Sequence, residues 1–379
     1  MPLSESAGLV LAKHAASDVD SPPFDKALMD GFAVRACDGA GERQVVEEVT
    51  AGETPLQRVT PGTAIRIMTG APMPAGADAV VMVEQTEPVG ENRVRLFDTT
   101  IAPGQNIMRQ GESLLRGQMV LEEGTVIRPA DIGILAESGC AQPCVVPRPS
   151  VAILATGNEL VPASQMPTAG EIRNSNGPML AAAAAAAGGQ AHDFGIARDD
   201  PVALRSKIEE ALQHDVVVLS GGVSAGVLDL VPPTLEELGV GRVFHKVAMK
   251  PGKPTWFGVR QQASDGPRSL VFGLPGNPVS GLVCFELLVR PALRALGGHG
   301  FAEHPRCVAS LAEAVAQSAD RLTFRPARLQ ALSTGLSVKA VPWRGSADLA
   351  SLAAANALIV LSAGEVALAT GEQVEVVVL

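Results

Sequence analysis

Three neighbouring segments decide the fold expected for this chain: VVVLSGGVSAG (216–226), KVAMKPGKP (246–254) and SLVFGLPGNPVSG (269–281). Each apolar run leads into, or lies beside, a turn rich in glycine or proline. In an open α/β sheet, ligands bind at the turns that follow the carboxyl ends of the strands. Glycines in such turns let backbone N–H groups approach an anion closely, and Lys246, Lys250 and Lys253 add positive charge. The segments therefore predict a pocket for a ligand that carries phosphate or another oxyanion.

The pattern around these segments predicts an α/β multidomain fold. Alternating strands and helices over residues 148–298 predict a doubly wound α/β domain, with helices expected at residues 176–187, 201–213 and 278–296. Short β-type runs predict a small inserted β domain at 36–112. Residues 1–35 and 113–147 are expected to form a discontinuous linking domain, with a helix from Pro129 to about Gly139. Residues 299–379 predict a C-terminal β domain that resembles a barrel.

The composition limits the class of protein. At 379 residues the chain is too long for one ordinary core, and 46% hydrophobic with 18% charged residues is typical of a soluble globular protein. The net charge of −10 argues against a general binder of nucleic acid or anionic membranes. The N-terminal apolar patch is too short for a signal peptide, and no apolar run is long enough to span a membrane. A cytoplasmic location is therefore expected.

The five cysteines and six histidines form no recognisable metal motif. Cys140 and Cys144 have no second Cys/His pair nearby, so buried or incidental thiols are a better interpretation than a zinc site. The histidines lack the HExxH type of spacing. An odd number of scattered cysteines is typical of a reducing compartment.

Three acidic residues follow predicted strands and are candidates for holding a metal or a ligand. Glu159 ends the turn that begins at Thr156 and Gly157, where it can equally be a solvated turn residue. Asp199 precedes Asp200-Pro201, and this sequence is also typical of a helix cap that needs no ligand. Asp229 lies a few residues after the turn GGVSAG (221–226), and it is either a metal ligand or a surface residue.

Two glycine turns and a lysine loop are candidates for binding an anion. The turn from Ser220 to Ser224 offers backbone donors and hydroxyls, but the chain lacks the GxxxxGK[ST] and GxGxxG motifs of common nucleotide kinases and dinucleotide dehydrogenases. The segment from Gly273 to Pro278 favours an anion at the start of a helix, and it equally suits a rigid turn. In KPGKP (250–254) two prolines stiffen a loop that carries two cations, which favours oxyanion capture over a solvated basic loop.

These motifs and their order resemble the molybdopterin molybdenumtransferases of the MoeA type, a family that includes the E domain of gephyrin. The resemblance extends from about Gly8 to Leu379. It is carried by PPFDKALMDGFAVR (22–35), AIRIMTGAPMPAGADAVVMVE (64–84), NIMRQGES (106–113), ILATGNEL (153–160), LSGGVSAGVLD (219–229), MKPGKP (249–254) and FGLPGNPVS (272–280). The first two and the last three are highly specific in combination, whereas each alone would be weak.

The resemblance implies a function in molybdenum cofactor biosynthesis. The family inserts molybdate into the dithiolene of adenylylated molybdopterin, with Mg²⁺, and releases AMP. It implies a molybdopterin-binding α/β domain and a homodimer in which the inserted β domain of one subunit completes the pocket of the other. Partners expected on this basis are the molybdopterin adenylyltransferase and the molybdoenzyme apoproteins. The ene-dithiolate of the substrate supplies the sulfur ligands, so no protein cysteine is required.

The resemblance also implies roles for individual residues. The expected catalytic residues are Asp30, Thr69, Glu159, Asp199, Asp229, Lys246 and Lys250, with Glu159 and Asp229 as ligands of Mg²⁺. Asp30 and Thr69 are expected to close the pocket from a second subunit. The expected substrate-binding residues are Thr156, Gly157, Ser220, Gly221, Gly222, Ser224, Lys253, Gly273, Pro275, Gly276, Asn277, Pro278, Ser280, Ser346 and Arg321, with Arg325 as the alternative to Arg321.

Three departures from the family pattern leave other functions open. An N-terminal helix of the family is largely missing, Ala27 replaces a usual serine, and Ser113 replaces a usual aspartate, which leaves Glu112 as the carboxylate of that tripeptide. The hypothesis that follows is reduced rather than absent activity. The alternative functions are a molybdopterin adenylyltransferase and a non-catalytic scaffold or weakened paralogue. The sequence does not distinguish molybdate from tungstate, because both are similar tetrahedral dianions.

Overall fold

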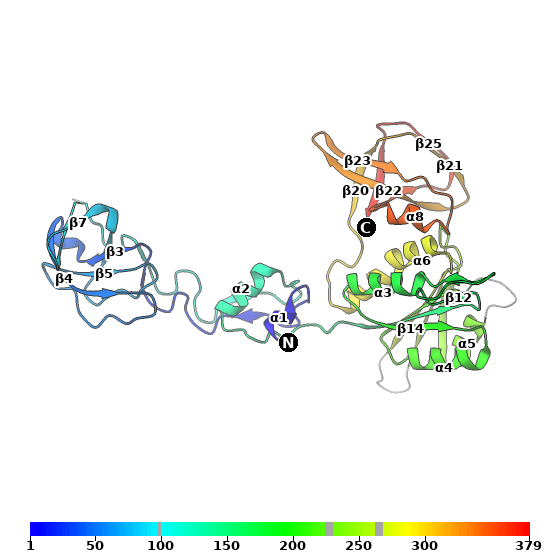
Figure 1. The fold of residues 1–379 in the computed structure, drawn as a ribbon, viewed down its shortest axis with the longest axis horizontal. Coiled ribbons are helices and arrows are strands. Elements are labelled where there is room, and N and C mark those ends of the chain that lie inside the picture. Colours follow the sequence, from blue (N-terminus) through cyan, green and yellow to red (C-terminus); the bar gives the residue numbers. More distant parts are fainter. Residues whose placement is uncertain (98–99, 224–229, 262–267) are drawn as a thin grey trace. The chain divides into compact units, whose positions relative to one another are not determined.

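The computed structural model describes residues 1–97, 100–223, 230–261 and 268–379. The chain forms two compact units, Met1–Val145 and Val146–Leu379, and each is described by itself. Figure 1 gives the order of their helices and strands. Among the described residues, no helix combines the length and the apolar character needed to cross a membrane.

The two ends of the first unit pack against each other. Strand β1 (Ala15–Ala16) pairs with β10 (Met119–Leu121), and bridges join Val10 to Val126 and Leu11 to Val145. A small core of Leu11, Ala15, Ile127 and Leu135 lies between helices α1 (Leu3–Ser6) and α2 (Pro129–Glu137) and these strands. The predicted helix at Pro129 is confirmed, and it ends just before Gly139, whose φ of 82° is unfavourable for other residues.

The middle of the first unit is a six-stranded sheet in the order β6-β3-β5-β4-β8-β7. Its strands are β3 (Gly31–Val34), β4 (Gly41–Val49), β5 (Thr63–Ile67), β6 (Ala79–Met82), β7 (Thr86–Pro88) and β8 (Arg93–Leu96). Short 3₁₀ turns occur at η1 (Ala36–Asp38) and η2 (Val83–Gln85), and β2 (Lys26–Ala27) pairs with β9 (Ile107–Met108). Alternate residues enter the two hydrophobic clusters on either side of the sheet, Ala33 on one side and Phe32 on the other. Although the expected boundary lies after residue 35, β3 pairs with β5 and β6 inside this sheet.

The first part of the second unit is the predicted doubly wound α/β domain. Its sheet has the order β14-β11-β15-β19-β18-β16. The strands are β11 (Ser150–Thr156), β14 (Gln190–Ala197), β15 (Val216–Ser220), β16 (Val240–His245), β18 (Trp256–Arg260) and β19 (Ser269–Leu274). The first four in sheet order are parallel, whereas β18 is antiparallel to both of its neighbours. The register places Ala155, Ser220 and Leu274 side by side, so the turns after these strands share one edge.

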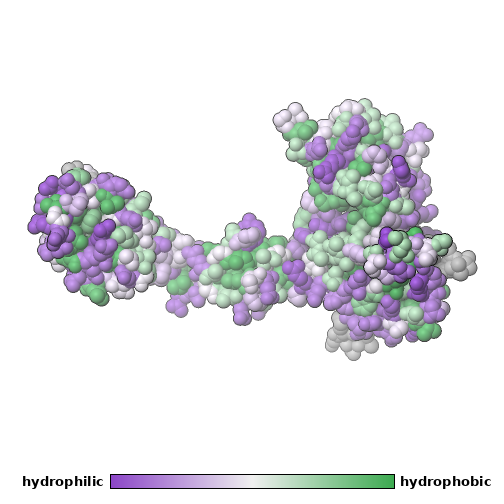
Figure 2. All heavy atoms as spheres, in the orientation of Figure 1, coloured by the Kyte–Doolittle hydropathy of each residue, from purple (hydrophilic) through white to green (hydrophobic). Residues whose placement is uncertain are grey.

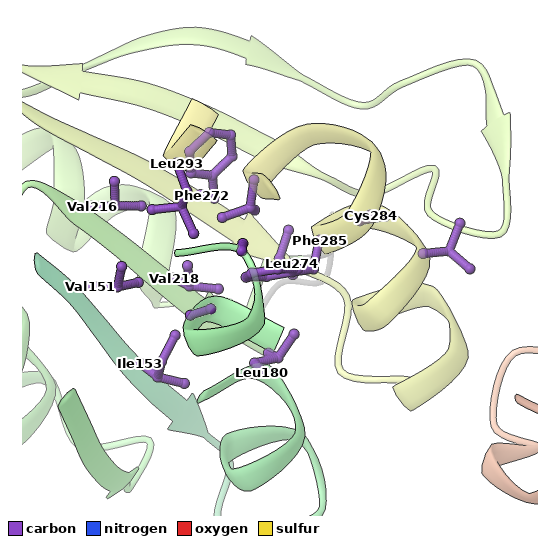
Figure 3. Packing of buried hydrophobic residues seen from close by; sticks show 14 of the residues in the cluster. Val151, Ile153, Leu180, Val216, Val218, Phe272, Leu274, Cys284, Phe285 and Leu293 are labelled. Atoms are coloured by element: carbon purple, nitrogen blue, oxygen red, sulfur yellow. The ribbon is translucent and has the colours of Figure 1, made fainter. Parts of the chain in front are cut away.

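Helices cover both faces of this sheet (Figure 1). On one face, α3 (Asn176–Ala186), α6 (Pro278–Cys284) and α7 (Arg290–Leu296) pack on alternate strand residues, as Figure 3 shows for Val151, Ile153 and Val218 facing Leu180 and Phe285. On the other face, α4 (Pro201–Ala211) and α5 (Val231–Glu237) contribute Leu204 and Leu235 to a second core. Helices α3, α4 and the pair α6 and α7 confirm the three predicted helices, whereas α5 was not predicted.

The long helix predicted from Pro278 to Leu296 is confirmed with one irregularity. A π-helical turn, η3 (Phe285–Val289), joins α6 to α7. Pro291 follows directly, and its ring nitrogen has no hydrogen to donate to the preceding turn. A π-helical turn is one way in which a helix accommodates such a break in its hydrogen-bond ladder.

The C-terminal part of the second unit contains a closed barrel of five strands. These are β20 (Arg306–Leu311), β22 (Leu322–Leu332), β23 (Gly335–Ala340), β24 (Ala357–Leu361) and β26 (Gln373–Val378). The barrel closes because β22 pairs with β24 through its first half and with β23 through its second half. Strands β21 (Val315–Ala319) and β25 (Gly364–Leu368) pair outside the barrel, and α8 (Leu349–Ala353) precedes β24. The predicted β-barrel-like domain is thus confirmed.

One short strand connects the two parts of the second unit. Strand β17 (Met249–Lys250) pairs in parallel with the start of β22, at Leu322 and Thr323. The apolar core of the α/β domain also includes barrel residues, Phe324, Leu358 and Val377 among them. The loop that carries Lys250 and Lys253 is therefore held against the barrel.

Candidate functional site

The shared edge of the parallel strands opens into a cavity of about 470 Å³, which we call the carboxylate cavity. It lies at the ends of β11, β15 and β19, beside the first turn of α3. Of the predicted site residues, those that line it are Thr156, Gly157, Glu159, Asp199, Ser220, Gly221, Gly222, Pro275, Gly276 and Asn277. Ser224 and Asp229 lie outside the described residues. The structure therefore brings together the predicted glycine turns and two of the three predicted carboxylates.

The glycine turn after β15 has a conformation that requires glycine. Gly221 and Gly222 have φ values of 94° and 65°. A Cβ atom on Gly221 would lie 2.6 Å from the carbonyl oxygen of Thr156, and one on Gly222 would lie 2.9 Å from a methyl carbon of Val231. The turn therefore packs directly against the end of β11, and its backbone faces the cavity without side chains.

Asn176 connects three elements around this cavity and was missed by the sequence analysis. Its side-chain amide donates to Ser220 Oγ at 2.8 Å and to the carbonyl oxygen of Gly276 at 2.7 Å. These bonds join the start of α3 to the end of β15 and to the turn after β19. The side chain is buried, so its hydrogen bonds hold both glycine turns in register. An asparagine at a helix start has many local roles, and its sequence position alone does not reveal this one.

The two carboxylates of the cavity are exposed and differ from their neighbour Asp200. Asp200 accepts a hydrogen bond from the backbone N–H of Ala203 at 2.8 Å and caps α4. Asp199 instead faces the cavity, where it accepts from the backbone N–H of Asn158 at 3.3 Å. The helix-cap interpretation therefore holds for Asp200, while Asp199 and Glu159 stay available to a ligand.

The carboxylate oxygens of Glu159 and Asp199 are of the type that Mg²⁺ prefers. Within the described residues, however, no group of three or more His, Cys, Asp or Glu side chains is close enough to hold a metal ion. Mg²⁺ commonly takes only one or two protein carboxylates and completes its shell with water and substrate phosphates. The residues present fit a magnesium ion that binds together with a phosphate-bearing substrate.

A second cavity of about 490 Å³, which we call the cationic cavity, adjoins the first. The two cavities share Pro254, Pro275 and Asn277. Among the described residues, four cations and no carboxylate line the cationic cavity; the cations are Lys250, Lys253, Arg321 and Arg344. Of the predicted residues, Ser280 and Ser346 line it as well. This arrangement suits an anion with more than one negative charge.

The cationic cavity is built by contacts between the α/β domain and the barrel. Pairing of β17 with β22 places Lys250 beside Thr323. The turn at Ser346 is held by two bonds from the other side: Asn277 Nδ2 donates to Ser346 Oγ at 2.9 Å, and the backbone N–H of Val279 donates to the carbonyl oxygen of Ser346 at 3.0 Å. The Val279 N–H is therefore occupied by Ser346.

Of the cations that line the cationic cavity, Arg321 is paired with a neighbouring carboxylate. Arg321 Nε donates to Asp320 Oδ1 at 2.9 Å, and this bond lowers the pKa of the Asp320 carboxyl, with a smaller contribution from the charge of Lys253. Asp320 thus balances part of the charge of Arg321 from outside the lining. Among the described residues, the side chains of Lys250, Lys253 and Arg344 make no hydrogen bond or ion pair. Their charges are available to a ligand.

The buried thiol of Cys284 packs against the loop that carries Lys250 and Lys253. Gly252 has a φ of 116°, and a Cβ atom there would lie 2.4 Å from Cys284 Sγ. The Thr255 hydroxyl donates to the carbonyl oxygen of Gly252 at 2.7 Å and lies 3.2 Å from Cys284 Sγ. Cys284 belongs to the core shown in Figure 3. The loop is therefore positioned by packing as well as by its two prolines.

Cys284 is expected to resist thiol reagents in the folded chain. Burial raises the pKa of its thiol to about 12, so the reactive thiolate is scarce near neutral pH. Mass spectrometry after brief iodoacetamide treatment is expected to find label on the exposed Cys37 and Cys144 and none on Cys284, with all five cysteines labelled in denaturant. Rapid native labelling of Cys284 would contradict the packed loop.

Four predicted residues lie away from both linings. Lys246 is exposed with a φ of 75°, and its backbone N–H donates to Thr255 O. Arg325 lies in β22, and its Nε is buried without a partner among the described residues. Gly273 is an interior strand residue, where a Cβ atom would meet Val223 at 2.6 Å, and Pro278 opens α6. Of the two predicted arginines, Arg321 is the one that lines the cationic cavity.

In the first unit, Asp30 and Thr69 form a small hydrogen-bonded pair. Asp30 Oδ1 accepts from the backbone N–H of Thr69 at 2.7 Å and from its hydroxyl at 2.8 Å. The backbone bond, and then the side-chain bond, lower the pKa of the Asp30 carboxyl. Asp30 is therefore ionised at neutral pH and held in one orientation.

Replacing Thr69 with valine is expected to raise the pKa of Asp30 part of the way back to its ordinary value. The substitution removes the hydroxyl donor but keeps the backbone donor, which is the larger cause of the shift. Because the folded-state pKa is depressed, the contribution of these bonds is present at neutral pH and is lost as the pH falls through that pKa. A carboxyl NMR titration checks this, and an unchanged Asp30 pKa in the variant would contradict the pairing.

Ala27 and Glu112, which belong to two of the three departures, make local contacts in the first unit. Ala27 is buried in the core of the inserted β domain, and its backbone bonds to Ala71 and Gly70 make the turn there. Glu112 Oε2 accepts from the backbone N–H of Arg109 at 2.7 Å, so it closes its own turn beside Ser113. Glu112 is therefore engaged in its own turn through one of its two carboxylate oxygens.

The comparisons with known proteins cover nearly the whole chain. Residues 1–139 match the MoeA N-terminal region (domain I and II), residues 152–295 a probable molybdopterin binding domain, and residues 308–379 the MoeA C-terminal region (domain IV). A molybdopterin molybdenumtransferase from Staphylococcus aureus (strain Mu50) is 34% identical over 389 residues, which cover 99% of this chain and 90% of that protein.

Solved structures give the same result. One molybdopterin biosynthesis MoeA protein from Pyrococcus horikoshii superposes with a TM-score of 0.82 and 34% identity, over 100% of this chain and 93% of that chain. Another, from Pyrococcus horikoshii OT3, has a TM-score of 0.79 and 30% identity, over 100% and 94% of the two chains.

Proposed function

Because the chain belongs to the MoeA family of molybdopterin molybdenumtransferases, we propose that it inserts molybdate into the dithiolene of adenylylated molybdopterin, with Mg²⁺-dependent release of AMP. The chain is a transferase of molybdenum cofactor biosynthesis. The observation that carries the finer proposal is the junction of two cavities of opposite character, one with carboxylates and one with cations.

The cationic cavity is the proposed site of molybdate. Lys250, Lys253 and Arg321 offset its two negative charges, and the hydroxyls of Ser280 and Ser346 donate hydrogen bonds. The backbones of Lys250 and Lys253 are held by β17 and the supported loop, and the Arg321 side chain is held by Asp320, so little backbone movement is needed when the anion binds.

The carboxylate cavity is the proposed site of the phosphate end of the substrate. The Gly221 and Gly222 turn and the hydroxyls of Thr156 and Ser220 bind phosphate oxygens. Glu159 and Asp199, with Asp229 outside the described residues, hold Mg²⁺. When bound there, Mg²⁺ offsets the negative charge that develops as the phosphoanhydride to AMP breaks. Pro254 and Asn277 line both cavities, so the cavities adjoin and one extended substrate can reach both.

A second copy of the chain is the proposed source of Asp30 and Thr69. Their hydrogen bonds keep the carboxylate ionised and oriented within the first unit, as a residue that acts on a partner's substrate requires. We further propose a cytoplasmic homodimer that exchanges substrate with the adenylyltransferase and molybdoenzyme apoproteins. The domain boundaries expected from the sequence stand as part of this proposal, with β3 joined to the inserted β domain.

The test is a defined reaction with purified chain, adenylylated molybdopterin, molybdate and Mg²⁺. We expect AMP release that depends on molybdate, together with reconstitution of an apo-molybdoenzyme. A parallel reaction with molybdopterin and ATP, without molybdate, tests the adenylyltransferase alternative. Adenylyl transfer in that reaction, without metal insertion in the first, would contradict the proposal.

A further inference from the structure

The turn from Trp343 to Ser346 contributes two residues to the cationic cavity that molybdate binding leaves unused, Trp343 and Arg344. The indole N–H of Trp343 donates to the carbonyl oxygen of Gly345 at 2.6 Å. Its polar atom is thus satisfied within the turn. The half-buried ring therefore offers a ligand its carbon surface rather than its N–H.

The cationic cavity is larger than an oxyanion needs. Its volume of about 490 Å³ falls within the ~300–1,000 Å³ of pockets that hold drug-sized ligands. Its walls include Pro251, Pro254 and Pro275 in addition to Trp343, so much of the lining is apolar. A tetrahedral oxyanion uses the lysines and leaves these walls without a partner. The space beside Trp343 suits a flat, largely apolar group.

Arg344 places a cation next to the ring. Its backbone N–H donates to Asp348 Oδ2 at 3.1 Å, while its exposed guanidinium has no hydrogen-bond or ion-pair partner among the described residues. Arg321 differs, because Asp320 holds it. Arginine binds phosphate oxygens in a bidentate manner and stacks on planar rings. Arg344 is therefore free to contact a charged group that is attached to a planar one.

The turn is held in place from both of its ends. Ser346 is bonded to Asn277 and Val279 of the α/β domain, and Asp348 receives Arg344 N–H while its side chain also caps α8. The positions of the Trp343 ring and the Arg344 backbone are thus fixed before a ligand arrives, which reduces the entropy lost on binding.

We propose that Trp343 and Arg344 recognise the planar nitrogen heterocycle of a phosphate-bearing ligand that extends from the carboxylate cavity, with the ring stacked on Trp343 and Arg344 attracting the ligand's negative charge. This inference rests on the proposed function, because adenylylated molybdopterin has two such groups, the adenine and the pterin. Trp343 and Arg344 would thus select the heterocycle of the substrate, a role separate from the binding of molybdate by Lys250, Lys253 and Arg321.

Calorimetric titration of the full chain with AMP, neopterin monophosphate and molybdate tests the assignment. Trp343→Leu is expected to weaken binding of one heterocycle about 10- to 100-fold, as loss of base stacking does, while Trp343→Phe keeps most of the affinity. Molybdate affinity stays within about twofold in both variants. Weaker AMP binding identifies the adenine as the group that stacks, and weaker neopterin monophosphate binding identifies the pterin.

Arg344→Gln is expected to weaken binding of the same heterocycle about tenfold, because the attraction between the guanidinium and the ligand's negative charge is lost. Arg328→Gln is the matched control, because Arg328 is exposed on β22 and lines neither cavity. Equal affinities in wild type, Trp343→Leu and Arg344→Gln overturn the inference, as does a loss confined to molybdate or a wild-type chain that binds neither heterocycle. If wild type still inserts molybdate in those cases, only this inference fails. A wild type that does not insert molybdate refutes the proposed function itself.

Discussion

Replacing Lys250 with glutamine is expected to lower the rate of molybdate insertion by about 100- to 1,000-fold. Glutamine keeps much of the side-chain length but removes the charge from a cavity whose charged lining, in the part of the chain that the structure describes, consists of cations. Loss of one preorganised donor from an oxyanion site has an effect of about this size in other enzymes. The rate is measured as molybdenum incorporated per AMP released.

Lys339→Gln is the matched control for this variant. Lys339 lies on β23 of the barrel, pairs with Glu313 on the surface and lines neither cavity. Because an exposed ion pair contributes only ~0–1 kcal/mol to stability, we expect a wild-type rate from this control. Similar rates for Lys250→Gln and Lys339→Gln would show that molybdate insertion does not depend on the cationic cavity.

Replacing Gly221 with alanine is expected to abolish ligand binding in the carboxylate cavity and to lower the free energy of unfolding by about 2–6 kcal/mol. A φ of 94° strains any other residue, and the new Cβ atom would meet the Thr156 carbonyl oxygen at 2.6 Å. The turn has to move away from β11, which also displaces Ser220 from Asn176. Calorimetric titration with AMP and denaturant unfolding measure the two effects.

Gly239→Ala separates backbone strain from the clash. Gly239 has a similar φ of 79°, but no atom lies within 4 Å of its added Cβ. This control carries the strain alone, so it is expected to lose about 1–3 kcal/mol of stability and to bind AMP normally. If Gly221→Ala binds AMP as tightly as Gly239→Ala does, the glycine turn is not part of the AMP-binding site.

Local sequence signals predicted much of the fold. Pro129 and Gly139 bracket α2, and the apolar runs of β11, β15 and β19 end at the turns where the carboxylate cavity forms. These signals depend on residues that are close in sequence, such as a proline at a helix start or a glycine with positive φ. Figure 2 shows that polar and apolar residues alternate over small areas of the face in view.

Long-range pairing explains what the sequence did not reveal. The partnership of β17 with β22, and the bonds from Asn277 and Val279 to Ser346, join segments about 70 residues apart and create the cationic cavity. Nothing near Trp343 or Arg344 in sequence indicates that they reach it. Of the three predicted lysines, strand pairing and the supported loop direct Lys250 and Lys253 into the cavity, while Lys246 stays outside.

The most direct test of the account is the position of molybdenum in crystals grown with molybdate, AMP and Mg²⁺. Anomalous diffraction at the molybdenum edge identifies the metal by its element. We expect the peak in the cationic cavity, within hydrogen-bond reach of Lys250, Lys253 and Arg321, with the AMP phosphate at the Gly221 turn. A molybdenum peak that lies outside the cationic cavity while that cavity stays empty would contradict the account.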